Sequence, residues 1–407
     1  MASRDSSHEG SNEDFQARNI ELLARMRAEL AITPYRATQL STSIKNRIEH
    51  KTKYTDKPNR GIIVKRNSWA DYAKAIGIIL VVYGHVARGV YNAGIPLDPN
   101  TFNLVDSVLY SFHMPLFFFL SGLFFYESLV KRGAIGLTIN KLDTIIYPYI
   151  AWSLLQGFVE AFLAKYTNGS ATFSEVLSFA WQPRAQFWFM YALFLIFIVS
   201  SLAYSVLDRS KTPLLLILFG VLYIFKKEFS FNLASSFILG NTFFFILGVY
   251  FNDFKSSFEK YSAKLAMAFG LLFIAGQYIY HQALGLNYTS GGLNTLALAT
   301  TSIFFAIALS MCLARLEIRW LLYIGASSMA IYLMHILAGS GARVILNKFL
   351  TINSTTVHLA IGTLVGVVAP LIAQEVIKRC KLTFLIAPPI SAAKLFSLTK
   401  KERAEQS

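Results

Sequence analysis

The sequence predicts an all-α integral membrane protein with about ten transmembrane helices and with both termini in the cytosol. Of its 407 residues, 54% are hydrophobic and only 15% are charged, whereas an ordinary soluble domain has about 25% charged residues. The apolar residues form blocks of roughly 18 to 25 residues, the length that crosses a hydrocarbon core of ~30 Å as a helix. The formal net charge is +15, and the Lys and Arg residues lie mostly between these blocks.

Ten apolar segments account for most of the chain. They cover residues 69–90, 104–127, 145–164, 187–207, 213–225, 235–252, 263–283, 293–314, 320–340 and 357–377. Segment 213–225 is short for a span, so nine or eleven spans are also compatible with the sequence. Residues 67–380 are expected to form the transmembrane domain, between a polar cytosolic arm at 1–66 and a cytosolic tail at 381–407. The arm could be disordered or could form a short amphipathic helix on the membrane.

The distribution of Lys and Arg predicts the orientation. With a cytosolic arm, the connections on its side carry more of these residues, including Lys131, Lys141 and Arg209, than the opposite connections, where Arg88 and Arg343 are placed. Cytosolic loops of membrane proteins carry such an excess. The high net charge is therefore interpreted as a topology signal and not as a nucleic-acid binding surface.

The first segment contains three residues that are costly inside a membrane. Asp71, Lys74 and His85 lie within WADYAKAIGIILVVYGHVARGVY, and a charge at the bilayer centre costs about 2.5–3.5 kcal/mol on insertion scales. Lys74 and His85 are eleven residues apart, which places them ~16 Å apart on one helix face. Asp71 lies one turn before Lys74 and can balance its charge. The alternative is that Lys74 reaches the headgroups and that His85 is a packed or interfacial histidine.

Two further histidines, His113 and His335, lie in other apolar segments. In the predicted orientation all three imidazoles fall in the outer half of the membrane, whereas Lys74 lies near the cytosolic end. Imidazole is the usual general base near neutral pH, because it can both take and return a hydroxyl proton. The two cysteines, Cys312 and Cys380, lack metal-type spacing, so no metal site is predicted.

Five motifs along the chain together carry a family resemblance. Lys74 and His85 have Lys-x10-His spacing in the context DYAKAIG, and they are followed by FHMPLFFFLSG at 112–122, KLDTIIYPY at 141–149, QFWFMYALF at 186–194 and IGASSMAIYLMH at 324–335. In this order the motifs resemble the acyltransferase-3 family of membrane O-acyltransferases. The resemblance covers roughly 67–380 and is closest to the fucose-4-O-acetylase-like and exopolysaccharide acetyltransferase branch.

The resemblance implies roles for nine residues. The implied catalytic residues are His85 and His113, the implied donor-binding residues are Lys74, Asp71 and Lys141, and the implied supporting residues are Ser121, Trp188, Tyr332 and His335. Lys74 stands where many members have Arg, so it offers a point charge instead of a two-pronged contact to phosphate. The sequence also lacks the extracytoplasmic SGNH-type domain that some members carry, so a single-protein mechanism is assumed.

The expected function is transfer of an acyl group, expected to be acetyl, from cytosolic acyl-CoA to a hydroxyl of an extracytoplasmic or lipid-linked glycan. The resemblance implies acyl-CoA as co-substrate, no bound cofactor, and a place in the bacterial inner membrane. A transporter or flippase for a glycan or lipid intermediate is the alternative, although the chain shows no clear internal repeat of the kind many transporters have. The sequence leaves the acceptor sugar and the oligomeric state open.

Overall fold

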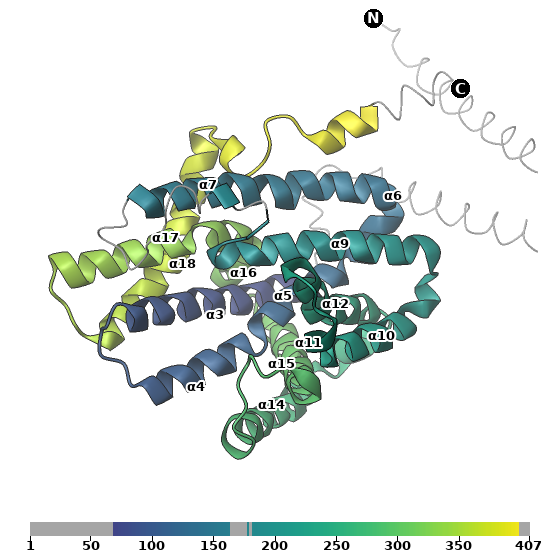
Figure 1. Cartoon of the computed structure of the whole chain (residues 1–407), viewed down its shortest axis with the longest axis horizontal. Helices are drawn as coiled ribbons and strands as arrows, with labels where there is room; N and C mark the ends of the chain where they lie inside the picture. Colours follow the sequence, from purple (N-terminus) through teal and green to yellow (C-terminus); the bar gives the residue numbers. More distant parts are fainter. Residues whose placement is uncertain (1–67, 163–176, 179–180, 399–407) are drawn as a thin grey trace, which may run out of the picture. The chain divides into compact units, whose positions relative to one another are not determined.

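The computed structural model describes residues 68–162, 177–178 and 181–398, which form one compact helical unit (Figure 1). Within these ranges the chain forms helices and turns and no β-strand, as the sequence predicts. The predicted arm at 1–66 lies outside the described residues.

The helices follow one another with short connections. The α-helices are α3 (Ser68–Asn92), α4 (Pro99–Tyr110), α5 (His113–Leu123), α6 (Phe125–Lys141), α7 (Tyr147–Phe162), α9 (Trp188–Val206), α10 (Thr212–Ile224), α11 (Lys226–Phe229), α12 (Leu233–Phe251), α13 (Lys255–Lys260), α14 (Ser262–Tyr278), α15 (Gly292–Leu313), α16 (Arg319–Ala326), α17 (Ser328–Val344) and α18 (Thr355–Arg379). Three π-helical turns, η1 (Leu142–Ile146), η5 (Ile279–Ala283) and η7 (Ile345–Phe349), extend or join them.

Eight helical stretches in the described part of the chain are long and apolar enough to cross a membrane. They are Ser68–Asn92, Pro99–Leu123, Ala185–Val206, Leu233–Phe251, Ser262–Ala283, Gly292–Leu316, Ser328–Phe349 and Thr355–Arg379. The two other predicted segments correspond to α7, whose described part has 16 residues, and to α10, which has 13. Many spans are therefore confirmed, while the count of ten and the cytosolic termini stay predictions.

Helix α3 is the central helix of the bundle. It packs against α4, α5, α15, α16, α17 and α18, and Figure 1 shows it running between α4 and the pair α17 and α18. Ala73, Ala75 and Val82 on this helix are fully buried. Small residues let helix backbones approach closely in membranes, where van der Waals packing and not water exclusion joins helices. The side chains of α3 are therefore held in place by several neighbouring helices.

Glycines from two of the sequence motifs allow close backbone contacts. A Cβ at Gly122 on α5 would lie 1.8 Å from the Phe245 carbonyl oxygen of α12, and one at Gly248 on α12 would lie 2.0 Å from the Phe119 oxygen of α5. A Cβ at Gly325 on α16 would lie 1.7 Å from the Asp71 oxygen of α3. The glycines of FLSG and IGAS thus serve helix packing.

Replacing Gly248 with alanine is expected to lower the free energy of unfolding by about 1–3 kcal/mol, because the new methyl group must push α5 away from α12. Gly240 on the same helix is the matched control, since a Cβ there meets no atom within 4 Å. Gly240→Ala should leave stability unchanged or slightly higher, because alanine favours helix by about 1 kcal/mol over glycine. Thermal unfolding of the two purified variants measures the difference, and equal midpoints would contradict the close contact.

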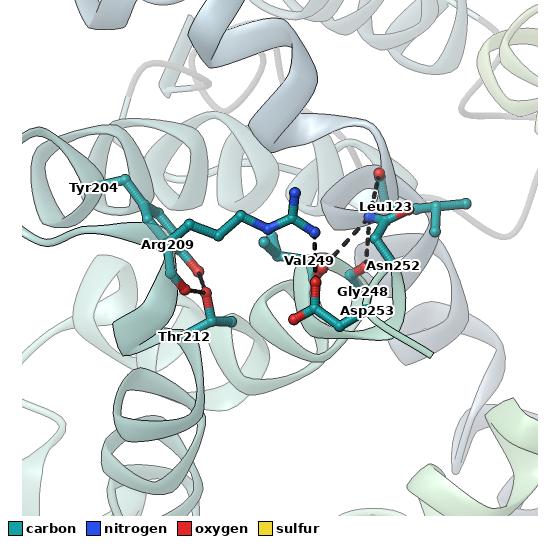
Figure 2. Close-up of polar contacts among 8 residues, drawn as sticks. All are labelled: Leu123, Tyr204, Arg209, Thr212, Gly248, Val249, Asn252 and Asp253. Carbon is teal, nitrogen blue, oxygen red and sulfur yellow. Dashed lines mark hydrogen bonds and ion pairs between the residues drawn. The ribbon is translucent and has the colours of Figure 1, made fainter. Parts of the chain in front are cut away.

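Polar contacts hold together one end of the bundle (Figure 2). Arg209, before α10, pairs with Asp253, after α12, at 2.6 Å, and Asn252 donates to the Leu123 oxygen of α5 at 2.8 Å. Leu123 is followed by Phe124, whose ring centroid lies 5.8 Å from Lys74 Nζ. This end of the bundle is therefore the end that carries Lys74.

The segment predicted as a tail packs on the transmembrane domain. Tyr147 donates to the Phe384 oxygen at 2.6 Å, and Trp152 Nε1 donates to the Leu385 oxygen at 2.7 Å. Asp143 accepts hydrogen bonds from Ser391 Oγ at 2.7 Å and from the backbone of the next two residues. Side chains of η1 and α7 thus hold residues beyond 380 against the helical bundle.

Candidate functional site

Helices α16 and α17 run beside α3 in the same direction, and this register brings two histidines together. Gly325 meets Asp71 near the start of α3, and Arg343 of α17 donates a hydrogen bond to the Gly89 oxygen near its end. Between these contacts, the ring centroids of His85 and His335 are 5.1 Å apart. Residues 250 positions apart in the sequence therefore form an imidazole pair.

The second member of this pair, His335, is held in one orientation. It is 1% exposed, and its Nδ1 lies 2.9 Å from the Tyr332 oxygen and 3.1 Å from the Ile331 oxygen. Carbonyl oxygens only accept hydrogen bonds, so Nδ1 carries a proton and Nε2 of the neutral ring is an acceptor. Nε2 is buried and has no hydrogen-bond partner among the described residues. His335 therefore presents a fixed acceptor within the protein.

His113 joins this cluster through Tyr110. The Tyr110 ring centroid lies 6.4 Å from that of His85 and 4.5 Å from that of His113. His113 is 1% exposed, and its Nδ1 donates to the Leu109 oxygen at 2.5 Å. The structure thus brings the three predicted histidines into one cluster, in which the Tyr110 ring packs against both His85 and His113.

A cavity of about 820 Å³ opens beside the imidazole pair. Both His85 and His335 line it, together with residues of α7, α17 and η7, whereas His113 does not. Among the described residues, His85 makes no side-chain hydrogen bond, and its side chain is only partly buried. His85 is therefore the histidine of the cluster that is placed to meet a molecule in the cavity.

Arg88, an arginine next to the histidines, was not among the site residues predicted from the sequence. Arg88, one turn after His85, binds Asp106 through two nitrogens at 2.7 and 2.8 Å and donates to the Tyr288 hydroxyl at 3.0 Å. Its guanidinium carbon lies 3.4 Å from the Tyr110 ring centroid. Arg88 was assigned to a connection, but it lies inside α3, because the helix continues to Asn92. The sequence did contain a signal for this role, because Arg88 lies three residues after the predicted base His85.

The structure places Lys74 at the far end of the same helix face from His85. Its Nζ lies 3.0 Å from Asp71 Oδ1, and its side chain is 28% exposed while that of Asp71 is 5% exposed. The predicted charge balance between these two residues is confirmed. Lys74 is therefore a tethered cation that can still be reached from outside the bundle.

Lys141 lies at the end of α6, outside the eight candidate spans. Its Nζ lies 4.1 Å from the Phe197 ring centroid of α9. Phe197 in turn packs on Phe125, with ring centroids 5.8 Å apart. Phe125 directly follows Phe124, the residue whose ring lies next to Lys74. Burial and, to a smaller extent, the nearby Arg132 charge together lower the pKa of Lys141 to about 8. The two predicted donor-binding lysines thus lie at the same end of the bundle without direct contact.

The predicted supporting residues have different surroundings. Ser121 donates to the Phe117 oxygen of its own helix at 2.8 Å, which leaves it outside the histidine cluster. Trp188 stacks on Phe237, with ring centroids 5.5 Å apart. Neither residue contacts His85, so the structure does not bring either into the cluster.

Tyr332 connects two of the motifs and leads to a buried polar chain. Its hydroxyl donates to the Gln186 oxygen, and Gln186 Nε2 donates to Gln156 Oε1 at 2.7 Å. Gln156 Nε2 donates to Glu160 at 2.8 Å, and Glu160 lines the cavity. Gln186 begins the motif at 186–194 but was given no role, and Gln156 was missed, since a single Gln in an apolar segment carries no recognisable spacing. The two glutamines tie α7 and α17, which both line the cavity, to the start of α9.

Comparisons with known proteins agree with this architecture. A family model for an acyltransferase domain, that of the acyltransferase-3 family, matches residues 67–375. Nodulation protein NolL of Sinorhizobium fredii (strain NBRC 101917 / NGR234) is 28% identical over 145 residues, which cover 34% of this chain and 37% of that protein. The chain thus matches only about a third of the length of this relative. No solved structure matches the chain significantly. The chain belongs to the acyltransferase-3 family, and its described part has eight helices that are long and apolar enough to cross a membrane.

Proposed function

We propose that the protein transfers an acyl group, expected to be acetyl, from cytosolic acyl-CoA to a hydroxyl of an extracytoplasmic or lipid-linked glycan, with His85 as the general base. The observation that carries this proposal is the cavity of about 820 Å³ beside the His85–His335 pair. A cavity of this size lies in the range of small-molecule sites. The family match favours acyl transfer over transport of a glycan or lipid.

The position of Lys74 supports a donor that enters from the opposite end. Lys74 and His85 are eleven residues apart on the continuous helix α3, so ~16 Å of one helix face separates them. In acyl-CoA the phosphates and the thioester are likewise separated, because a long pantetheine arm joins them. Phosphates near Lys74 would therefore allow the thioester to reach His85. Reporter fusions near 136 and 258, expected in the cytosol, and near 97 and 287, expected outside, can test these sides.

The proposed reaction needs one base and one well-placed thioester. His85 takes the proton of the acceptor hydroxyl while the hydroxyl oxygen bonds to the thioester carbonyl carbon. The carbon–sulfur bond then breaks, and His85 returns the proton to the departing thiolate of CoA. The products are the glycan ester and free CoA, so atoms and charge balance. Base catalysis of this kind contributes typically about 10²- to 10⁴-fold.

His335 would position the base in this scheme. Its Nδ1 is held by backbone oxygens, so its Nε2 can accept a hydrogen bond from the N–H of His85. Such a bond leaves the other nitrogen of His85 with its lone pair directed away from His335. This is the role that an orienting residue has toward the base in hydrolase triads. His335 is therefore a positioning residue and His85 the group that touches the substrate.

The proposal predicts a mass difference on the cell surface. Glycans from cells that express the protein should carry ester groups that are absent from cells without it, and mass spectrometry identifies both the acyl group and the modified sugar. The added mass should disappear after mild alkali, which cleaves esters. Identical glycan masses in the two strains, with the protein present in the membrane, would contradict the proposed function.

A further inference from the structure

Arg88 lines the cavity next to the proposed base, and the protein uses only part of its guanidinium. Nε and Nη2 bind the two oxygens of Asp106 at 2.7 and 2.8 Å, and Nη2 also donates to the Tyr288 hydroxyl at 3.0 Å. Nη1 makes no hydrogen bond to any residue that the structure describes, and 31% of the side chain is exposed. Nη1 therefore carries two N–H donors that a molecule in the cavity can use.

The guanidinium of Arg88 is held in one orientation. Asp106 on α4 binds it through both carboxylate oxygens, and the side chain of Asp106 is only 11% exposed. The Tyr110 ring centroid, also on α4, lies 3.4 Å from the guanidinium carbon. A two-pronged carboxylate pair and an aromatic ring together fix both the plane and the direction of an arginine side chain. The direction of Nη1 is thus set before any substrate binds.

The free donors of Arg88 lie close to the imidazole of His85. The two residues are three positions apart on the continuous helix α3, and side chains at this spacing are neighbours with ~5–6 Å between their Cβ atoms. The same Tyr110 ring that stacks on Arg88 lies 6.4 Å from the His85 ring, measured between centroids. Both residues line the cavity. A molecule that His85 contacts is therefore also within reach of Arg88.

The proposed transfer creates a negative charge that the base does not meet. When the hydroxyl oxygen bonds to the thioester carbon, an electron pair of the carbonyl group moves onto the carbonyl oxygen. The carbonyl group forms again when the carbon–sulfur bond breaks and its electron pair leaves with the sulfur. His85 faces the attacking hydroxyl during these steps and not the carbonyl oxygen. Donors that are already fixed at this oxygen lower the barrier of such reactions.

We propose that Arg88 is a second catalytic residue, whose Nη1 donates hydrogen bonds to the carbonyl oxygen of the acyl thioester and stabilises its negative charge. This inference rests on the proposed acyl transfer with His85 as the base. Arg88 transfers no proton, because a guanidinium is not deprotonated in proteins. Asp106 balances the charge of Arg88, so the arginine does not strongly oppose the positive charge that His85 gains as it takes the proton.

Replacing Arg88 with glutamine is expected to lower kcat by about 10²- to 10³-fold, the effect of removing one such donor. KM for donor and acceptor should change little, because the contact strengthens only as the charge develops. Arg88→Lys keeps a cation beside Asp106 and thereby the fold, but a single nitrogen replaces the three-nitrogen group, so kcat should also fall. Initial rates are measured on the purified full-length protein with acetyl-CoA and with surface glycan extracted from cells that lack it.

Arg209→Gln is the matched control for the loss of an ion pair. Arg209 also binds an aspartate, Asp253 at 2.6 Å, and its guanidinium carbon lies 5.1 Å from the Tyr126 ring centroid, but it does not line the cavity. This variant should keep the wild-type kcat. Equal losses of kcat in Arg88→Gln and Arg209→Gln would overturn the inference, as would an unchanged kcat in Arg88→Lys. A higher acceptor KM at unchanged kcat would also overturn it, since Arg88 would then bind the glycan.

A binding measurement tests the same contact without turnover. Trifluoroacetonyl-CoA carries a ketone whose hydrate resembles the tetrahedral carbon of the reaction, whereas propyl-CoA is a thioether without an oxygen at this place. Calorimetry should show about tenfold tighter binding of trifluoroacetonyl-CoA by the wild type, the gain from a hydrogen bond to a charged donor. Arg88→Gln should lose this preference and bind propyl-CoA as the wild type does. The same preference in wild type and Arg88→Gln would overturn the inference.

The role of Arg88 and the proposed function fail in different ways. Transfer that depends on His85 but proceeds at the wild-type kcat in Arg88→Gln would remove only the role of Arg88. Absence of any ester formation that depends on His85 in the wild-type protein would remove the proposed function itself.

Discussion

Replacing His85 with alanine is expected to reduce acyl transfer by about 10²- to 10⁴-fold, because a methyl group cannot take the proton of the acceptor hydroxyl. His85 is the histidine of the cluster that lines the cavity without a hydrogen bond to another described residue. His335 is not placed to replace it, since its Nδ1 is bound to backbone oxygens and its Nε2 is buried. The measurement is the initial rate of ester formation from acyl-CoA by purified protein at saturating donor.

A histidine outside the cluster provides the control for this variant. His358 on α18 is 1% exposed, and its Nε2 donates to the Ile352 oxygen at 2.7 Å. A glutamine at 358 can still donate a hydrogen bond, so His358→Gln should keep a transfer rate close to that of the wild type. Near-wild-type transfer by folded His85→Ala protein would reduce His85 to a packing residue. Equal losses in both variants would point to a general loss of structure.

Replacing Lys74 with alanine is expected to weaken acyl-CoA binding by about 10- to 100-fold, the effect of losing a hydrogen bond between charged groups. Lys74→Arg keeps the cation and should retain most of the affinity, even though the geometry of the two groups differs. Asp71 anchors the ammonium at 3.0 Å, while more than a quarter of the side chain, 28%, stays exposed to a ligand. Calorimetric titration of the purified variants with acyl-CoA measures the affinities.

An exposed lysine on another helix separates donor binding from surface charge. Lys378 lies in the last turn of α18, where it is exposed, and Lys378→Ala removes one positive charge as Lys74→Ala does. Donor affinity should be unchanged in Lys378→Ala. Unchanged affinity in folded Lys74→Ala protein would remove Lys74 from the donor site, and Lys74 would then only anchor the start of α3.

Much of the fold could be predicted because membrane spans are a local property. An apolar block of sufficient length must become a helix in hydrocarbon, since every backbone polar group has to be satisfied within the segment. The predicted segment 104–127 contains a break near Ser111, where α4 ends before α5 begins. Segment 320–340 is likewise divided, between α16 and α17 at Ser327. Such breaks depend on contacts with neighbouring helices, so hydrophobicity alone did not reveal them.

The sequence by itself determined the helical membrane class, the family resemblance and the Lys74–His85 spacing, because each depends on residues near one another or on motifs in order. Only the tertiary structure decided that the ring centroids of His335 and His85 lie 5.1 Å apart while Ser121 stays outside the cluster. It also decided that Arg88 binds Asp106 and that a cavity opens beside the histidine pair. The physical reason is that the spacing along one helix follows from its fixed rise, whereas the register of α16 and α17 against α3 follows from close packing at glycines, such as Gly325 against the Asp71 backbone and Gly339 against the Val86 side chain.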